Sequence, residues 1–254
     1  MSRVRRKSDL AAIGVVGIAL ALLVWAFVRA RSERPSLDAR AAPLERDGIA
    51  RIEAGPYAAD PRDWDVPNAP HVVVVLDAFL IDAREVTEGA YEACVRRGAC
   101  TGVELRGSPS LPVTRVSARE ARAFCVDRGG ALPSALQFAR AAGGPNGARF
   151  PWGDIGPVCA SAAWGRAEGP CAFGETVPDP VGSHPSGSTS EGIDDLAGNV
   201  AEWIEGGDGR VEIRGGSFRD SAPTPLKTWA ARTASDDQRF DDVGFRCAYP
   251  APPR

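Results

Sequence analysis

One stretch of twelve residues, Gly192–Trp203, constrains the fold more than any other part of the chain. It mixes acids and small residues with the pair Gly198-Asn199 and closes on a tryptophan. Glycine allows a tight backbone bend, and asparagine tolerates the left-handed region. The stretch therefore predicts a sharp turn leading into a buried strand, with Trp203 in the core.

The same turn carries two acids, Asp195 and Glu202. A bent backbone can point carbonyl groups inward beside these carboxylates, and calcium prefers ligands that are all oxygen. We therefore expect a calcium site at this turn. The alternative is that both acids are simply solvated, and the spacing of the acids does not match an EF-hand loop.

The N-terminal region contains an apolar run without charges, Leu10–Val28. Its 19 residues are long enough to cross a bilayer as a helix. We predict a cytoplasmic segment at 1–9, a membrane anchor at 10–28, a tether at 29–50 and one domain at 51–250. Basic residues flank the run on both sides, so the placement of the domain outside the cytoplasm depends mainly on the cysteines that follow. A cleaved signal peptide is the alternative.

Charge is distributed unevenly along the chain. Residues 1–50 contain 9 Lys or Arg and 5 Asp or Glu, whereas the remainder contains 21 and 28. An acidic outer domain argues against nucleic-acid binding and favours a cation or a basic partner.

The cysteine content is six, an even number, and outside the cytoplasm all six are expected to pair. Six cysteines allow 15 connectivities. Proximity in sequence favours Cys94–Cys100 and Cys159–Cys171, which leaves Cys125–Cys247. A zinc site is disfavoured, because the chain has no C-x-x-C pair and only two histidines.

Local signals predict few regular elements. Val72–Phe79 is an apolar β-branched run and predicts a buried strand. Thr87, Ser117 and Ser134 each predict the start of a short helix, the last two with capping boxes. Residues 143–195 are rich in Gly, Pro and Ser, and the tryptophans and the Cys159–Cys171 pair predict an ordered loop there. The composition indicates a compact, loop-rich α+β domain.

Several blocks in order along Ile52–Ala248 resemble the formylglycine-generating enzyme family, also called sulfatase-modifying factors. The turn Gly192–Trp203 matches the family block G-x-x-D-M-x-G-N-V-x-E-W. The other matching blocks are Ile52–Pro56, Glu85–Thr87, Pro112-Val113 with Val116-Ser117, Leu132–Ser134, Pro151–Gly153, Arg214–Phe218 and Gly244–Cys247.

This resemblance implies a fold distantly like C-type lectin domains. It supports the Cys125–Cys247 bridge, and it maps the calcium ligands of the family onto Asp195, Gly198, Val200 and Glu202. Gly198 and Val200 would contribute backbone carbonyls. Ser217 matches the family's active-site serine, so Arg214 and Ser217 are weak candidates for substrate binding, with a structural turn as the alternative.

The resemblance fails at the catalytic metal. Family enzymes bind copper(I) through two cysteines that follow the Arg-Gly-Gly-Ser block, and these positions are Asp220 and Pro225 here. Soft thiolates select copper(I), whereas a carboxylate is a hard ligand and proline has no donor. We therefore expect no bound copper and no catalytic residues of the family type.

Other chemistry has little support in the sequence. A Ser-His-Asp triad could use His184 with Ser183 or Ser186, but a solvated or capping histidine fits that Pro/Gly/Ser loop better. The iron site of the related sulfoxide synthases needs a histidine cluster that two separated histidines do not supply.

The sequence therefore predicts a membrane-anchored, extracytoplasmic module that binds a protein, peptide or glycan. A divergent oxidoreductase of the sulfatase-maturation type is the alternative.

Overall fold

The computed structural model describes residues 48–58, 73–172, 174, 176–207 and 209–253. The chain divides into two compact units, 1–44 and 45–254, and every described residue belongs to the second. The predicted anchor at 10–28 lies outside the described residues. No helix within the described ranges has both the length and the apolar character needed to cross a bilayer. The folded unit already forms a strand at Ile49, before the predicted domain start at residue 51.

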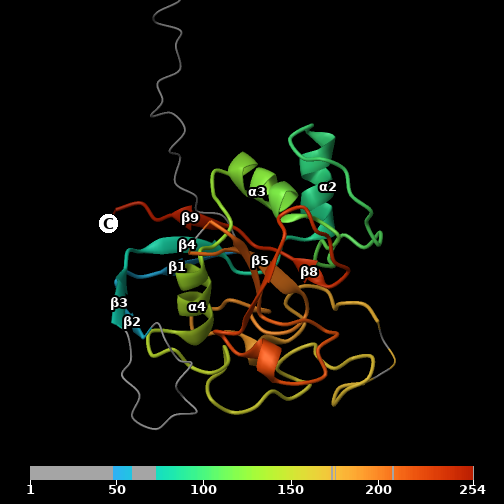
Figure 1. The fold of residues 1–254 in the computed structure, drawn as a ribbon. Coiled ribbons are helices and arrows are strands. Elements are labelled where there is room, and N and C mark those ends of the chain that lie inside the picture. Colours follow the sequence, from blue (N-terminus) through green and yellow to red (C-terminus); the bar gives the residue numbers. More distant parts are fainter. Residues whose placement is uncertain (1–47, 59–72, 173, 175, 208, 254) are drawn as a thin grey trace, which may run out of the picture. The chain divides into compact units, whose positions relative to one another are not determined.

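The described strands form three sheets (Figure 1). The first has the antiparallel order β1 (Ile49–Ile52), β4 (Phe79–Asp82) and β9 (Ala248–Pro250). The second is a hairpin of β2 (Gly55–Ala58) and β3 (Val73–Leu76). The third has the order β7 (Ala231–Ala234), β6 (Val211–Arg214), β5 (Ala201–Glu205) and β8 (Val243–Gly244), in which β5 and β8 are parallel.

Three helices begin where the sequence predicts. They are α2 (Glu88–Arg96), α3 (Ala118–Asp127) and α4 (Ala135–Gly143), and their N-caps are Thr87, Ser117 and Ser134. Each cap side chain accepts a hydrogen bond from a backbone amide of the first turn, and both predicted capping boxes are present. These starts are local in origin, because the cap and its partner are only three residues apart.

The helices pack on two different groups of partners. Tyr91 of α2 stacks on Phe124 of α3, with 5.7 Å between ring centroids, and α2 and α3 lie side by side in Figure 1. Helix α4 instead joins another apolar cluster, where Phe138 packs with Ile81 of β4 and Ile204 of β5. This cluster connects the first and third sheets through one helix.

The predicted strand at Val72–Phe79 is wrong in its extent and its burial. Residues 73–76 form β3 of the two-stranded hairpin, where Val73 and Val75 are 62% and 76% exposed. The buried strand is β4, which starts at Phe79 and has all four residues buried. An apolar run cannot by itself distinguish a strand covered on both faces from one arm of a projecting hairpin, since only tertiary packing covers the faces.

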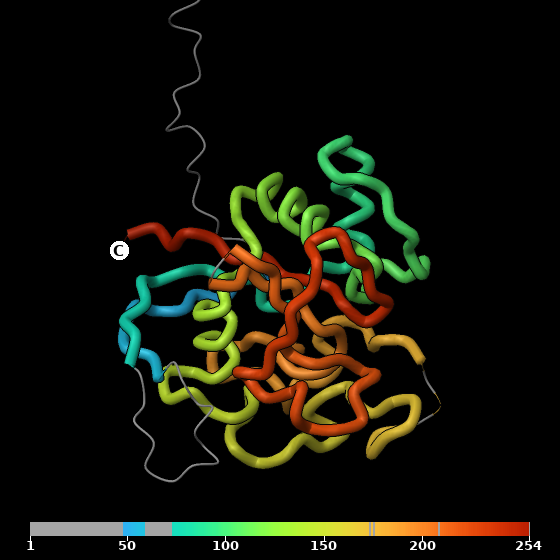
Figure 2. Tube along the Cα trace, viewed as in Figure 1, coloured from blue at the N-terminus to red at the C-terminus, as the bar shows by residue number. Residues whose placement is uncertain are grey.

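The described residues from 144 to 195 form an ordered loop as predicted, and their only helical segment is the short 3-10 helix η3 (Pro185–Gly187). Trp164 and Cys171 are buried within it, and Trp152 is partly buried. A second 3-10 helix, η4 (Thr224–Leu226), follows β6. In Figure 2 these loops, drawn yellow to orange, gather away from α2 and α3.

All three predicted disulfides are confirmed: Cys94–Cys100, Cys125–Cys247 and Cys159–Cys171. The Cys125–Cys247 bridge joins α3 to the chain just before β9 across 122 residues, and Figure 2 shows the red C-terminal trace passing beside α3. Asp82 strengthens the same junction, because its carboxylate accepts hydrogen bonds from Arg128, Tyr249 and the Cys247 amide.

Candidate functional site

The turn before β5 has the backbone that its sequence predicts. Gly198 has φ +83°, and Asp195 and Asn199 are two of the few described non-glycine residues with positive φ, at 58° and 55°. A Cβ at position 198 would lie 2.6 Å from the Ala163 carbonyl oxygen, so that position requires glycine. Trp203 is completely buried and donates its indole N–H to the Val116 carbonyl.

A buried glutamate fixes this turn from another part of the chain. Glu85 accepts a hydrogen bond from Asn199 Nδ2 at 2.7 Å and from the Val200 amide at 3.0 Å. Burial raises the pKa of Glu85 well above its usual range, and the nearby carboxylates of Asp195 and Glu202 raise it further.

Glu202 pairs with a completely buried arginine. Arg246 donates to both carboxylate oxygens of Glu202 at 2.8–3.0 Å, and it also donates to the Asp82 and Asp194 carbonyls. Burial raises the pKa values of Glu202 and Asp195, and the charge of Arg246 opposes this rise in both cases. Sequence analysis noted the Gly244–Cys247 block but assigned Arg246 no role, because no local pattern shows which carboxylate an arginine will meet.

The predicted calcium ligands lie on one turn and the strand it enters. Glu202 faces Arg246, and Asp195 Oδ2 accepts a hydrogen bond from the Gly182 amide at 2.6 Å. Among the described residues no three Asp, Glu, His or Cys side chains are grouped to hold a metal. A calcium ion here would therefore depend on backbone carbonyls together with the two carboxylates, which is the ligand set predicted from the sequence.

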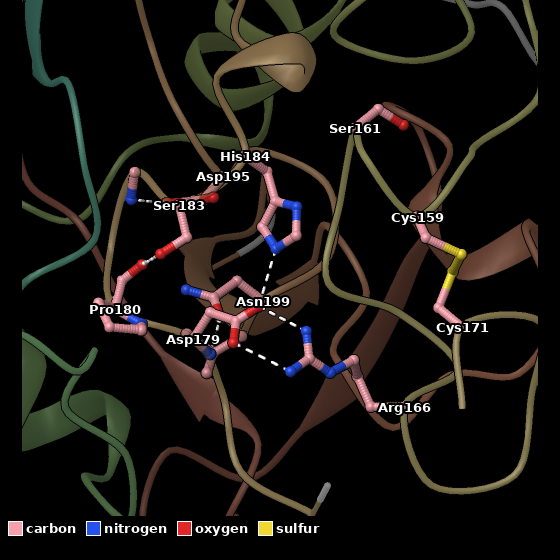
Figure 3. A network of polar contacts seen from close by, with 12 residues as sticks. Cys159, Ser161, Arg166, Cys171, Asp179, Pro180, Ser183, His184, Asp195 and Asn199 are labelled. Carbon is pink, nitrogen blue, oxygen red and sulfur yellow. Dashed lines mark hydrogen bonds and ion pairs between the residues drawn. A yellow bond between two sulfur atoms is a disulfide. The ribbon is translucent and has the colours of Figure 1, made fainter. Parts of the chain in front are cut away.

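A second polar network connects the loop of residues 143–195 to this turn (Figure 3). Asp179 accepts hydrogen bonds from both terminal nitrogens of Arg166, at 2.6 and 3.0 Å, and contacts His184 Nε2 at 2.8 Å. Its backbone amide donates to Asn199 Oδ1 at 2.9 Å. In Figure 3 the side chains of His184 and Arg166 converge on Asp179 from separate parts of the loop.

The prediction of a solvated or capping role for His184 is wrong. The side chain of His184 is 13% exposed, makes no capping hydrogen bond and pairs with Asp179. The hydrogen bond that His184 makes to the Asp179 carboxylate raises the pKa of His184, and the pKa of Asp179 is lowered, first by His184 and then by Arg166. Ser183 donates to the Pro180 carbonyl and not to the histidine, so the described geometry does not form a triad.

A pocket of about 260 Å³ lies at the other face of β5, and it contains both positions where the resemblance places copper-binding cysteines. Its polar lining is Asp220, Thr224, Arg232 and Asp242. Its apolar lining is Ala201, Ile213, Gly216, Pro225, Ala230 and Ala231. Asp220 and Pro225 therefore share one cavity.

Ser217 lies completely buried beside this pocket and connects its two carboxylates. Its hydroxyl lies 3.2 Å from Asp220 Oδ2 and 2.9 Å from Asp242 Oδ2, and its amide donates to Asp220 Oδ2 at 2.7 Å. Burial raises the pKa of Asp220, and the charge of Asp242 adds to the rise. No local pattern predicts that Asp242, 25 residues beyond Ser217, meets this serine.

Arg214 does not line the pocket. Ile213 of the same strand does, and neighbouring residues of a strand point to opposite faces. The guanidinium of Arg214 pairs with Glu212 at 2.7 Å. The structure thus brings Ser217, but not Arg214, to the Asp220 pocket.

Comparisons with known proteins agree with the family to which the sequence blocks point. The family model described as "Sulfatase-modifying factor enzyme 1-like domain" matches residues 35–251. "Inactive C-alpha-formylglycine-generating enzyme 2" from Mus musculus is 34% identical over 170 residues, covering 60% of this chain and 54% of the relative. "Hercynine oxygenase" from Mycolicibacterium thermoresistibile is 28% identical over 145 residues, covering 55% of this chain and 27% of the relative.

Solved structures show the same fold. PvdO from Pseudomonas aeruginosa superposes with a TM-score of 0.62 at 20% identity, covering 79% of this chain and 93% of that one. Treponema denticola variable protein 1 gives 0.61 at the same identity, covering 79% of this chain and 94% of that one. These matches confirm the predicted fold of mixed helices and sheets with few helices. The chain spans about half the length of the inactive enzyme and about a quarter of the oxygenase.

Proposed function

Because the chain belongs to the family of sulfatase-modifying factor enzyme 1-like domains, we propose that it is a binding or scaffold module of that family without copper-thiolate oxidase chemistry. Membrane anchoring through residues 10–28 and an extracytoplasmic location complete the proposal. Its partner is a protein, a peptide or a glycan.

The observation that carries this proposal is the lining of the pocket beside β5. Asp220 and Pro225 stand where the resemblance calls for two thiolates. All six cysteines of the chain are bound in disulfides, so none supplies a substitute thiolate. A hard carboxylate and an imino acid do not hold copper(I).

The names of relatives support both the proposal and its competitor. A relative with 34% identity is called inactive, which agrees with a non-catalytic use of this fold. Other relatives are called hercynine oxygenase, so a divergent oxidoreductase is the second candidate. The match to the oxygenases covers only about a quarter of their length, and an oxidase role here would need a redox centre other than a thiolate pair.

The deciding experiment supplies all the reactants of the family's cysteine oxidation. The purified chain is incubated with copper(I), oxygen, a thiol reductant and a peptide carrying the sulfatase-motif cysteine, and the peptide mass is followed. We expect no copper retention and no aldehyde. Conversion of the cysteine to an aldehyde would overturn the binding-module proposal in favour of the oxidoreductase.

A gain-of-function variant shows whether the pocket is otherwise competent. Asp220→Cys with Pro225→Cys should bind copper(I), because two thiolates would then line one pocket. Asp220→Cys alone is the matched control and should bind it far more weakly. Equal affinity of both variants would mean that the pocket no longer places these two positions for one metal.

The membrane assignment rests on Leu10–Val28 and on three disulfides, which form and persist in oxidising compartments. Its test is carbonate extraction of the full chain compared with a chain lacking residues 1–28. Retention of the full chain alone in the membrane fraction is the expected result, and release of both forms would remove the anchor from the proposal.

Calcium at the turn is a further part of the proposal. Glu85, Asp195 and Glu202 are buried acids around one guanidinium, Arg246, and burial raises the pKa of each. A hard cation would favour their ionised forms, and Asp195 and Glu202 with the Gly198 and Val200 carbonyls would be its ligands.

A further inference from the structure

The pocket beside β5 has the form of a small ligand site. Its volume of about 260 Å³ is below that of sites for whole drug-sized molecules, so it fits the end of a ligand or one long side chain. Its walls are mostly apolar, with Ile213 and Pro225 among them, and its charged groups are few. A ligand entering it would combine an apolar stem with a polar end.

The two acids of this pocket share one hydroxyl donor, and Asp220 Oδ2 also accepts a hydrogen bond from the Ser217 amide. Asp220 Oδ2 and Asp242 Oδ2 both lie within hydrogen-bond distance of the Ser217 hydroxyl, which has one hydrogen to donate. Whichever carboxylate receives it, the other faces the lone pairs of the same oxygen. A ligand with several N–H donors would correct this shortage, and a positive charge would offset the two carboxylates.

The single guanidinium of the lining does not supply the donors and the positive charge that the two carboxylates call for. Arg232 is exposed on β7, and its guanidinium lies over the Phe240 ring, 4.7 Å from the centroid. It lowers the pKa of Asp220, but by less than burial raises it. Two carboxylates and one guanidinium leave the lining with a net negative charge.

We propose that this pocket binds a primary alkylammonium group, whose N–H donors pair with Asp220 and Asp242 and whose alkyl stem packs on the apolar wall. This inference rests on the proposed binding function and names its chemistry. An ammonium has three donors and a compact charge, and the pocket is large enough to admit a four-carbon stem. Such a group occurs as a lysine side chain of a protein or peptide and as a free small amine.

The test measures binding to the full chain by NMR titration with three probes. They are n-butylammonium, N-acetyl-lysine amide and its uncharged counterpart, N-acetyl-norleucine amide. We expect both ammonium probes to saturate in the millimolar range and the uncharged probe to show no saturation. Tighter binding of the lysine amide would identify a peptide source, and equal binding of both would identify a small amine.

Variants assign the binding to the pocket. Asp220→Asn and Asp242→Asn should each weaken ammonium binding about tenfold, equivalent to about 1.4 kcal/mol. Asp77→Asn, at an exposed acid outside the pocket lining, is the matched control and should leave it unchanged. Ammonium affinity of the unmodified chain should also fall as the pH is lowered from 7 to 4, because ionised carboxylates are the acceptors; this readout needs no variant to fold.

Three results would overturn the inference: no saturation with either ammonium up to about 50 mM, equal binding of the uncharged probe, or full affinity in both Asn variants. None of these results depends on copper or on peptide oxidation. Loss of the ammonium site would therefore leave the binding-module proposal standing, and aldehyde formation would refute that proposal without touching this measurement.

Discussion

The turn around Asn199 and the pocket around Ser217 lie on opposite faces of β5, and the buried acids of the two regions have different hydrogen-bond partners. Consecutive residues of this strand serve the two regions, since Ala201 lines the pocket and Glu202 pairs with Arg246. At the turn a buried guanidinium and backbone amides meet the carboxylates. At the pocket two carboxylates share one hydroxyl hydrogen.

This difference separates residues that hold the fold together from residues that line a site. The turn holds distant parts of the chain together, because Glu85, Glu202 and Arg246 come from three separate segments. The pocket is lined by residues of β5, β6 and β7 and of the loops beside them, and its Asp220 and Pro225 stand at the positions that match the family's two cysteines.

The largest expected effect is at the turn. Arg246→Met should destabilise the full chain by about 3–5 kcal/mol, because it leaves Glu202 buried without its cation. Urea denaturation measures the change. Arg96→Met, in an exposed pair with Glu92, is the matched control and should cost at most about 1 kcal/mol. Equal losses in the two variants would contradict the contrast between the regions.

Calcium tests whether the three buried acids at the turn bind a cation. Calcium at 100 times its dissociation constant should stabilise the chain by about 2.7 kcal/mol over the same sample in chelator, read as a rise in Tm. In Glu202→Gln the calcium-dependent rise should disappear. If Tm is the same with calcium and with chelator, Arg246 alone compensates the turn.

His184 should give a pH-dependent effect of intermediate size. Because its pKa is raised in the folded chain, its contribution to stability is complete below the ordinary value of 6.5 and is lost as the pH rises through the folded pKa. His184→Gln should cost about 1.5–3 kcal/mol at pH 6, the range for a hydrogen bond to a charged group, and much less at pH 9. A cost that does not change with pH would show that the charge of His184 is unimportant.

The smallest expected effect is at the pocket and has the opposite sign. The pKa of Asp220 is raised, so its ionisation lowers stability as the pH rises from 3.8 through the folded pKa. Asp220→Asn should therefore raise stability at pH 7, by less than about 1 kcal/mol, and should flatten this part of the pH profile. A large loss of stability would mean that the pocket acids hold the fold together as the turn does.

The sequence by itself determined the features that depend on short range or on matching blocks. The three helix starts follow from caps and partners three residues apart, and the turn follows from Gly198 and Asn199. The disulfide set and the family were also readable, as was the replacement of the copper-binding cysteines by Asp220 and Pro225.

Only the tertiary structure decided which distant charges meet. Arg246 lies 44 residues from Glu202, His184 was expected at the surface, and Asp242 joins Asp220 through Ser217. The exposure of Val73 and Val75 could also not be predicted from the sequence, because burial depends on what covers a strand. The physical reason is common to all of these: the energy of a charge or an apolar face depends on its neighbours in space, and the order of residues along the chain does not specify them.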